Sequence, residues 1–304
     1  MPPKTRKDIY SSFQILYNFF YCVGVLSFSF DLKKRVYRTR KKHKIISALI
    51  LICVITLQTF LVSHCFPINH QIPSLELLFN LDSSLTFALL ILHFNRSCPK
   101  KIKLFKKIDT FDSNVKFTYA GTIGLFKYVV VNFALLLAFC CIDTIVNSNS
   151  QTPANKTCRF SLHNSAFSNV LVRVSFAFFV KEIQMRFEFL ENKKIFVGNL
   201  VELGEVCKSV NSLYSFPLMR NFGKVFFVVT TNMLYCIRES FATLNFFSAL
   251  VNCCWLGFAC FDVVSIVQPI ENLYSTVSFF LLLIVCIVWF QIRRVNLKIE
   301  EMNK

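Results

Sequence analysis

Residues 119–146, YAGTIGLFKYVVVNFALLLAFCCIDTIV, contain only one lysine and one aspartate among apolar and small polar side chains. Because a helix rises ~1.5 Å per residue, about 20 such residues cross the ~30 Å hydrocarbon core of a bilayer. Five more apolar runs are read as spans, the shorter ones lengthened by polar helical extensions: 45–66, 75–94, 167–180, 225–237 and 244–267. The sequence therefore predicts an all-α, polytopic transmembrane bundle with six spans, and a doubtful seventh at 277–292.

The composition excludes most soluble proteins. Hydrophobic residues make up 54% of the chain and charged residues 17%, and the mean hydropathy is +0.51. A soluble domain of 304 residues needs more polar surface to cover its core. The net charge of +17 is gathered in blocks between apolar runs, without zinc-finger spacing or an RNA-binding aromatic motif. We therefore predict that the basic residues face an anionic membrane surface and do not bind nucleic acid.

The distribution of lysine and arginine predicts the topology. The segments before span one, between spans two and three, and between spans four and five hold twenty-four of these residues, and the alternate loops hold three. Basic residues stay on the cytoplasmic side, so the N-terminus is predicted to be cytoplasmic. The glycosylation sequon at Asn155 then lies outside, whereas the one at Asn95 lies inside and should remain unmodified.

These features divide the chain into three parts. Residues 1–44 form a cytoplasmic N-terminal segment, 45–268 the bundle, and 269–304 a divergent C-terminal segment. Within the first part, 11–30 is predicted to be an interfacial or packed helix, since spanning would place basic residues on both sides. Within the second, 181–221 predicts two amphipathic helices on the cytoplasmic side, which pack on each other or on neighbouring subunits.

Cysteine and histidine give no sign of a metal site or of an enzyme. Most of the thirteen cysteines lie within spans, whereas Cys65 and Cys158 fall in predicted outside loops. These two either form a disulfide in an oxidising space or stay as free thiols. No metal-ligand spacing, His/Asp cluster, nucleophile turn or phosphate loop is present, so we expect neither a cofactor nor catalysis. A transporter would show inverted repeats and helices broken by glycine or proline, which the sequence lacks.

Polar side chains inside the predicted spans are costly and therefore mark candidate sites. Arg173 is placed in the outer half of span four and Asp262 near the cytoplasmic end of span six. The residues predicted to line an outward-open ligand cavity are Glu76, Asn80, Asp82, Asp143, Arg173, Asn232, Tyr235, Asn252 and Trp255. The alternative is that they pair with one another, for example Arg173 with Asp143 or Asp82, and only hold the bundle together.

Three blocks in register resemble the insect gustatory receptors, a branch of the arthropod seven-transmembrane chemoreceptor superfamily. They are ILYNFFYCVGVLSFSFD at 15–31, LVRVSFAFFVKEIQMRFEFLEN at 171–192 and VCKSVNSLYSFPLMRNFGKVFFVVTTNMLY at 206–235. The resemblance implies a tetrameric, ligand-gated cation channel in the plasma membrane of gustatory neurons. It also implies an outward-open cavity for a small tastant and an intersubunit anchor formed by the cytoplasmic helices.

The resemblance ends near Ser275. The family's pore span, with Thr-Tyr followed by Gln-Phe, has no counterpart, and the run STVSFFLLLIVCIVWFQIRRVNLKIEEMNK stands in its place. Val277-Ser278 can be encoded by a splice-donor sequence, and arginines after 292 would oppose the charge bias if this run spanned. We therefore expect a retained intron or faulty gene model here. The alternative function is then a truncated or mis-spliced receptor that conducts nothing.

Overall fold

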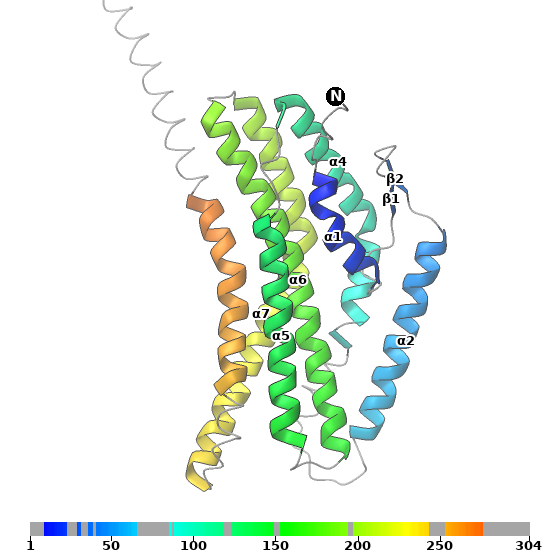
Figure 1. Ribbon diagram of the computed structural model, residues 1–304, viewed down its shortest axis with the longest axis vertical. Helices are drawn as coiled ribbons and strands as arrows, with labels where there is room; N and C mark the ends of the chain where they lie inside the picture. The colour runs from blue at the N-terminus through cyan, green and yellow to red at the C-terminus, as the bar shows by residue number, and fades with distance from the viewer. Residues whose placement is uncertain are drawn as a thin grey trace, which may run out of the picture.

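Long apolar and amphipathic helices running along one common axis make up the computed structural model (Figure 1). It describes residues 9–22, 29–31, 36–38, 41–65, 85–86, 88–117, 123–148, 153–193, 197–242 and 253–275. The helices are α1 (Ile9–Cys22), α2 (Lys41–Cys65), α4 (Cys98–Val115), α5 (Ile123–Ser148), α6 (Pro153–Lys193) and α7 (Val197–Ala242). Two unlabelled helical stretches complete it, 85–96 with residue 87 left out, and Cys253–Ser275. The predicted all-α class is confirmed apart from one small ribbon.

That ribbon, which the sequence did not indicate, pairs β1 (Ser29–Asp31) with β2 (Val36–Arg38). The strands are antiparallel, with Phe30 opposite Tyr37. The ribbon lies between α1 and α2 along the chain and is drawn above α2 in Figure 1.

Helix α6 is the centre of the bundle. It has 41 residues and begins at Pro153, whose fixed φ suits the first turn of a helix. It contacts α2, α5 and α7, and every residue from 168 to 180 is buried. The apolar run 167–180 that was predicted to be span four is therefore covered by other helices. The apolar side chains of this run face other helices of the described part, so their hydrophobicity does not show that they contact lipid.

The helices around α6 carry an exposed apolar belt. Large apolar side chains are exposed along these stretches: 45–60, 85–92, 130–145, 216–233 and 264–274. Two helices of the described part are long and apolar enough to cross a membrane, Lys127–Ile145 and Cys253–Ser275. Predicted span 45–66 coincides with α2, 225–237 is part of the 46-residue α7, and residues 75–84 and 244–252 of two other predicted spans lie outside the described residues. Residues 276–304, with the doubtful seventh run, lie outside the described residues.

The end of the bundle above the belt in Figure 1, here called the polar end, holds α1, α4 and the junction of α6 with α7. Of the helix predicted over 11–30, residues 11–22 belong to α1 and residues 29 and 30 to β1. Helix α1 is packed: its Phe13 is buried against Phe105 of α4 and Phe178 of α6, with ring centroids 4.8 and 5.1 Å apart. At 14 residues, α1 is too short to span. Helix α4 replaces the loop expected between spans two and three, and Lys116 ends it in the left-handed conformation at φ 53°.

The α6–α7 hairpin confirms the two predicted amphipathic helices. The stripe of α6, with Ile183, Phe187 and Leu190, is buried, as are Leu203 and Val206 of α7. These residues face helices of their own chain. Of the two predicted arrangements, the structure of the single chain contains the one in which the two helices pack within that chain.

Two prolines lie inside helices without ending them. Pro217 in α7 and Pro269 in Cys253–Ser275 have no backbone N–H, so each frees the carbonyl four residues earlier. Both carbonyls accept a hydrogen bond from another helix. His93 Nε2 donates to the carbonyl of Leu213 at 3.1 Å, and Tyr128 Oη to that of Ser265 at 3.4 Å. A buried helical backbone thus remains satisfied across each proline.

Candidate functional site

Of the nine predicted cavity residues, the structure describes the side chains of Asp143, Arg173 and Trp255. Glu76, Asn80, Asp82 and Asn252 lie outside the described residues. For the other predicted positions only the helical backbone is described: Asn232 and Tyr235 in α7, Asn155 and Cys158 in α6, and Cys65 at the end of α2. The sequon at Asn155 belongs to the first turn of α6, where a loop was expected.

Asp143 and Trp255 meet at a histidine that the sequence interpretation missed. His163 Nε2 lies 2.8 Å from Asp143 Oδ2, and the Asp143 side chain is 1% exposed. The indole of Trp255 stacks on the His163 ring, with centroids 6.4 Å apart and 22° between planes. Phe139 closes the group edge-on to Trp255 at 4.4 Å. We call Asp143, His163, Trp255 and Phe139 the aromatic–acid cluster.

Three helices build this cluster. Asp143 and Phe139 are one turn apart on α5, His163 comes from α6, and Trp255 from Cys253–Ser275. His163 was missed because residues before 167 were taken for a loop. Once α6 is continuous, His163 lies seven residues, or two turns, before Val170, which belongs to the buried run 168–180. A helical reading of that stretch would have placed it on the inner face.

The cluster has the chemistry of a small polar binding site. Asp143 holds the imidazole through Nε2, which leaves Nδ1 as the free ring nitrogen for another partner. The indole supplies a flat apolar face on which a ring or an organic cation can stack. The His163 side chain is 16% exposed, so this edge of the cluster reaches the surface of the described part.

Arg173 forms the second polar group, and its partner differs from the predicted ones. It pairs with Asp262, both side chains being buried, whereas Asp143 is used by His163. Phe261 and Phe258 lie beneath the guanidinium, with ring centroids 5.1 and 5.9 Å from Cζ. Of the two partners suggested for Arg173, Asp143 is paired with His163 and Asp82 lies outside the described residues; the helical register of Cys253–Ser275 presents Asp262 to Arg173.

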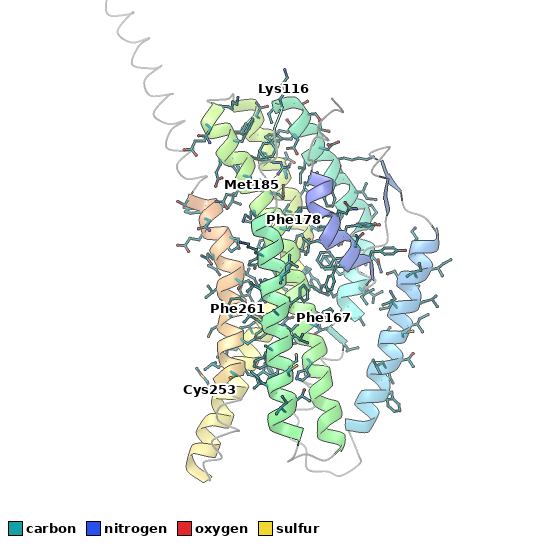
Figure 2. The ribbon with its side chains drawn as sticks, in the orientation of Figure 1. Lys116, Phe167, Phe178, Met185, Cys253 and Phe261 are labelled. Carbon is teal, nitrogen blue, oxygen red and sulfur yellow. The ribbon has the colours of Figure 1, made fainter. Side chains whose placement is uncertain are left out.

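This pair also corrects the predicted depths. Arg173 was placed in the outer half of one span and Asp262 near the cytoplasmic end of another, yet the two side chains touch. Figure 2 shows Phe167 and Phe261 at similar heights in the bundle. The error lies in the depths assigned to residues within the two runs. The segment of α6 that contacts the belt helices includes His163 and continues to Arg173.

Phe258 connects the two polar groups. It stacks on Phe139 at 5.3 Å, meets Trp255 edge-on at 6.3 Å and lies under Arg173. The contacts therefore run without a break from the aromatic–acid cluster to the Arg173–Asp262 pair. All of them lie in the seam between α5, α6 and Cys253–Ser275.

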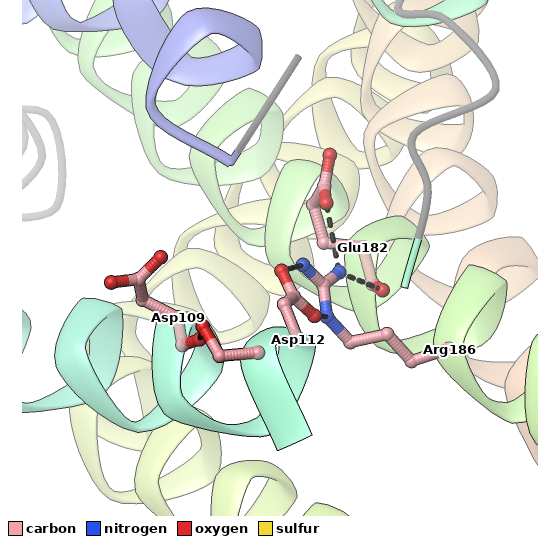
Figure 3. A network of polar contacts seen from close by, with 5 residues as sticks. Asp109, Asp112, Glu182 and Arg186 are labelled. Carbon is pink, nitrogen blue, oxygen red and sulfur yellow. Dashed lines mark hydrogen bonds and ion pairs between the residues drawn. The ribbon is translucent and has the colours of Figure 1, made fainter. Parts of the chain in front are cut away.

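A third group lies at the polar end and holds α4 to α6 (Figure 3). Arg186 is fully buried and donates to both carboxylate oxygens of Asp112, at 2.8 and 2.7 Å. It also donates to the Glu182 carboxylate at 2.9 Å, and its guanidinium lies over the Phe117 ring at 4.9 Å. Burial raises the pKa of Asp112, with Arg186 acting in the opposite direction. Every polar atom of the guanidinium faces a structural partner, so we assign this group to architecture.

Comparison of the sequence with models of known protein families and with curated proteins finds no match. Within the described part of the chain, no three His, Cys, Asp or Glu side chains are placed to hold a metal ion. The site must therefore be interpreted from its own chemistry.

Proposed function

We propose that the chain is a subunit of a membrane chemoreceptor of the gustatory type, a ligand-gated cation channel in which the aromatic–acid cluster binds a small polar tastant. The observation that carries the proposal is the continuous seam of contacts from Asp143 and His163 through Phe258 to Arg173 and Asp262. Burying polar side chains inside an apolar bundle costs folding free energy. Such residues in membrane spans are therefore typical of functional sites. The exposed apolar belt supports a position in the bilayer.

Within this proposal the topology has six spans with a cytoplasmic N-terminus, and the polar end lies in the cytoplasm. The basic residues of α4 and of the α6–α7 hairpin support that orientation. The aromatic–acid cluster then lies in the half of the membrane away from the cytoplasm. Arg173, being enclosed, positions the seam and does not contact ligand.

A thermal-shift screen of the purified full chain tests ligand binding. The probes are sucrose, fructose, caffeine and quinine, which offer hydroxyl groups, flat rings and an organic cation. We expect at least one to raise the melting temperature of the wild type. Asp143→Asn and Trp255→Leu should each weaken its apparent affinity by about tenfold or more, since a charge-assisted bond or a stacked ring is lost.

Glu205→Gln serves as the matched control, because this carboxylate is 55% exposed and lies at the polar end. A probe that stabilises all four proteins equally binds elsewhere and contradicts the assigned site. A screen in which no probe stabilises the wild type contradicts the receptor proposal as stated.

A further inference from the structure

A small cavity lies between helix 88–96, α6 and α7, apart from the seam. Its volume is about 20 Å³, and its polar lining comes mainly from His93, Asn169, Arg220, Asn221 and Lys224. Among the described residues that line it there are two cations and no carboxylate. Arg220 and Lys224 are one helical turn apart on α7, so both side chains leave the same face. The local charge favours an anion.

Asn221 has polar atoms that the described part of the chain does not satisfy. Its side chain is 3% exposed, and neither Oδ1 nor Nδ2 has a hydrogen-bond partner among the described residues. Native structures seldom bury an amide in this way, and a bound group is one of the usual reasons. An anionic oxygen in the cavity would accept from Nδ2, while Arg220 or Lys224 supplies the opposite charge.

The cavity lies just inside the belt, on the side of the polar end. Along α7 the exposed residues change from Lys208, Asn211 and Ser215 to Phe216 and Met219. Arg220 and Lys224 follow this change by about one and two turns. At this depth in a leaflet the phosphate and glycerol groups of lipids lie, and long cationic side chains reach them by extending toward the polar side.

The mouth of the cavity opens on the belt. Leu89 is 40% exposed and Phe216 50% exposed, and both line the cavity. A cavity of about 20 Å³ takes one or two atoms of the size of an oxygen. A phosphate would therefore enter by its oxygens only, and an attached glycerol and acyl chains would lie along Leu89 and Phe216. A free anion would gain nothing from those two apolar side chains.

We propose that this cavity is a binding site for the phosphate of an anionic phospholipid in the leaflet at the polar end. The site requires that the belt lies in a bilayer. It does not depend on ligand binding at the aromatic–acid cluster, so the two proposals can fail separately.

Competition between lipids in nanodiscs tests the site without any tastant. The full chain is reconstituted in phosphatidylcholine with a minor fraction of phosphatidic acid, re-extracted in mild detergent, and its retained lipid is measured by mass spectrometry. We expect wild type to enrich phosphatidic acid on the order of tenfold over the mixture, given two basic contacts. The double variant Arg220→Gln, Lys224→Gln should lose that enrichment, and Lys208→Gln, a cation 80% exposed on the same helix, should keep it.

Asn221→Leu separates binding from structure. If Asn221 serves the lipid, this variant loses enrichment and melts no lower than wild type in detergent without added lipid, because an unsatisfied buried amide has been removed. A lower melting temperature with unchanged enrichment would overturn the proposal. So would equal retention of both lipids by wild type. Stabilisation by inorganic phosphate in detergent, with the same dependence on Arg220 and Lys224, would assign the cavity to a soluble anion and overturn the lipid assignment.

Discussion

At the scale of single residues, the carbonyls of Leu213 and Ser265 explain the hydrogen bonds that His93 and Tyr128 donate. Each carbonyl loses its helical donor to a proline and gains one from a neighbouring helix. His93 must therefore carry its proton on Nε2, since a carbonyl can only accept. The ring is also held by Phe216, whose centroid lies 5.4 Å away at 28°.

We predict that His93→Leu lowers the free energy of unfolding by about 1–3 kcal/mol, because a buried carbonyl is left without a donor. Adding Pro217→Ala restores the backbone N–H and should recover most of the loss. Tyr128→Phe with Pro269→Ala forms a matched pair, with a smaller loss because Tyr128 Oη is farther from its carbonyl. Thermal unfolding in one detergent measures all variants. If Pro217→Ala rescues nothing, the carbonyl is not what His93 serves.

Lys101 is the residue with the clearest predicted pH dependence. Its side chain is 4% exposed with Nζ 3.6 Å from the Phe94 ring centroid, and burial lowers its pKa to about 7. The unfolded chain keeps the proton up to the ordinary pKa of 10.5. Between about pH 7 and 10 the unfolded state thus binds more protons, and stability contributed by Lys101 rises with pH.

The melting temperature of wild type should accordingly increase from pH 6.5 to 9.5, and Lys101→Met should flatten that increase and melt higher than wild type at pH 6.5. Lys103→Met, an exposed change on the same helix, is the control and should keep the slope. An identical slope in Lys101→Met would show that Lys101 is already charged in the folded protein.

At the scale of elements, the α6–α7 hairpin has positions buried within the chain and positions exposed for contact with another subunit. Phe187 and Leu203 are 6% and 0% exposed within one chain, so they cannot also form a contact between subunits. Val201, 64% exposed on α7, is available, and the neighbouring Gly204 has open space around it. An intersubunit anchor at the polar end can therefore use the face of α7 that carries Val201.

We predict that Leu203→Asp disrupts the polar end of the monomer, at a cost of about 3–5 kcal/mol for a buried unpaired charge. Val201→Asp should leave the monomer folded and reduce any tetramer. Circular dichroism measures the fold and mass photometry in detergent measures the assembly. A tetramer that survives Val201→Asp would place the anchor on another face, and a monomeric wild type would remove the anchor altogether.

The sequence predicted those elements whose apolar pattern has a single physical explanation, such as a stripe at helical spacing that packs on a neighbouring helix. The hairpin stripes at Phe187 and Leu203 follow from spacing, and the N-terminal helix α1 was predicted not to span from the basic residues on both of its sides. Helix α4 was missed because its buried residues, such as Leu104 and Ile108, are hidden in a run of lysines. The burial of the run 167–180 by other helices could not be predicted, because hydropathy measures removal from water, and a helix surrounded by protein satisfies that as well as one in lipid. The partner of Arg173 depends on tertiary register, which spacing within one helix does not contain.

At the scale of the whole molecule, the proposed topology has a direct test at two sequons. We predict that expression in insect cells gives a chain whose endoglycosidase-sensitive shift disappears in Asn155→Gln. Asn95→Gln should keep the shift, because the proposed topology puts Asn95 on the cytoplasmic side. Asn95 Nδ2 also donates to Ser47 Oγ of α2, so its amide is already engaged. A shift that depends on Asn95 would reverse the proposed orientation of the entire bundle.

The two proline-freed carbonyls lie at one height along α6. Asp262 pairs with Arg173, and Ser265 follows it by three residues, as Phe176 follows Arg173. Phe176 in turn meets Tyr214, the neighbour of Leu213, at 5.6 Å. A helix bends most easily where its own hydrogen-bond ladder is interrupted, so α7 and Cys253–Ser275 each have their weakest point at this common level. Helix α6 passes the same level without an internal proline. Any bend there would first have to break the hydrogen bond of His93 or of Tyr128.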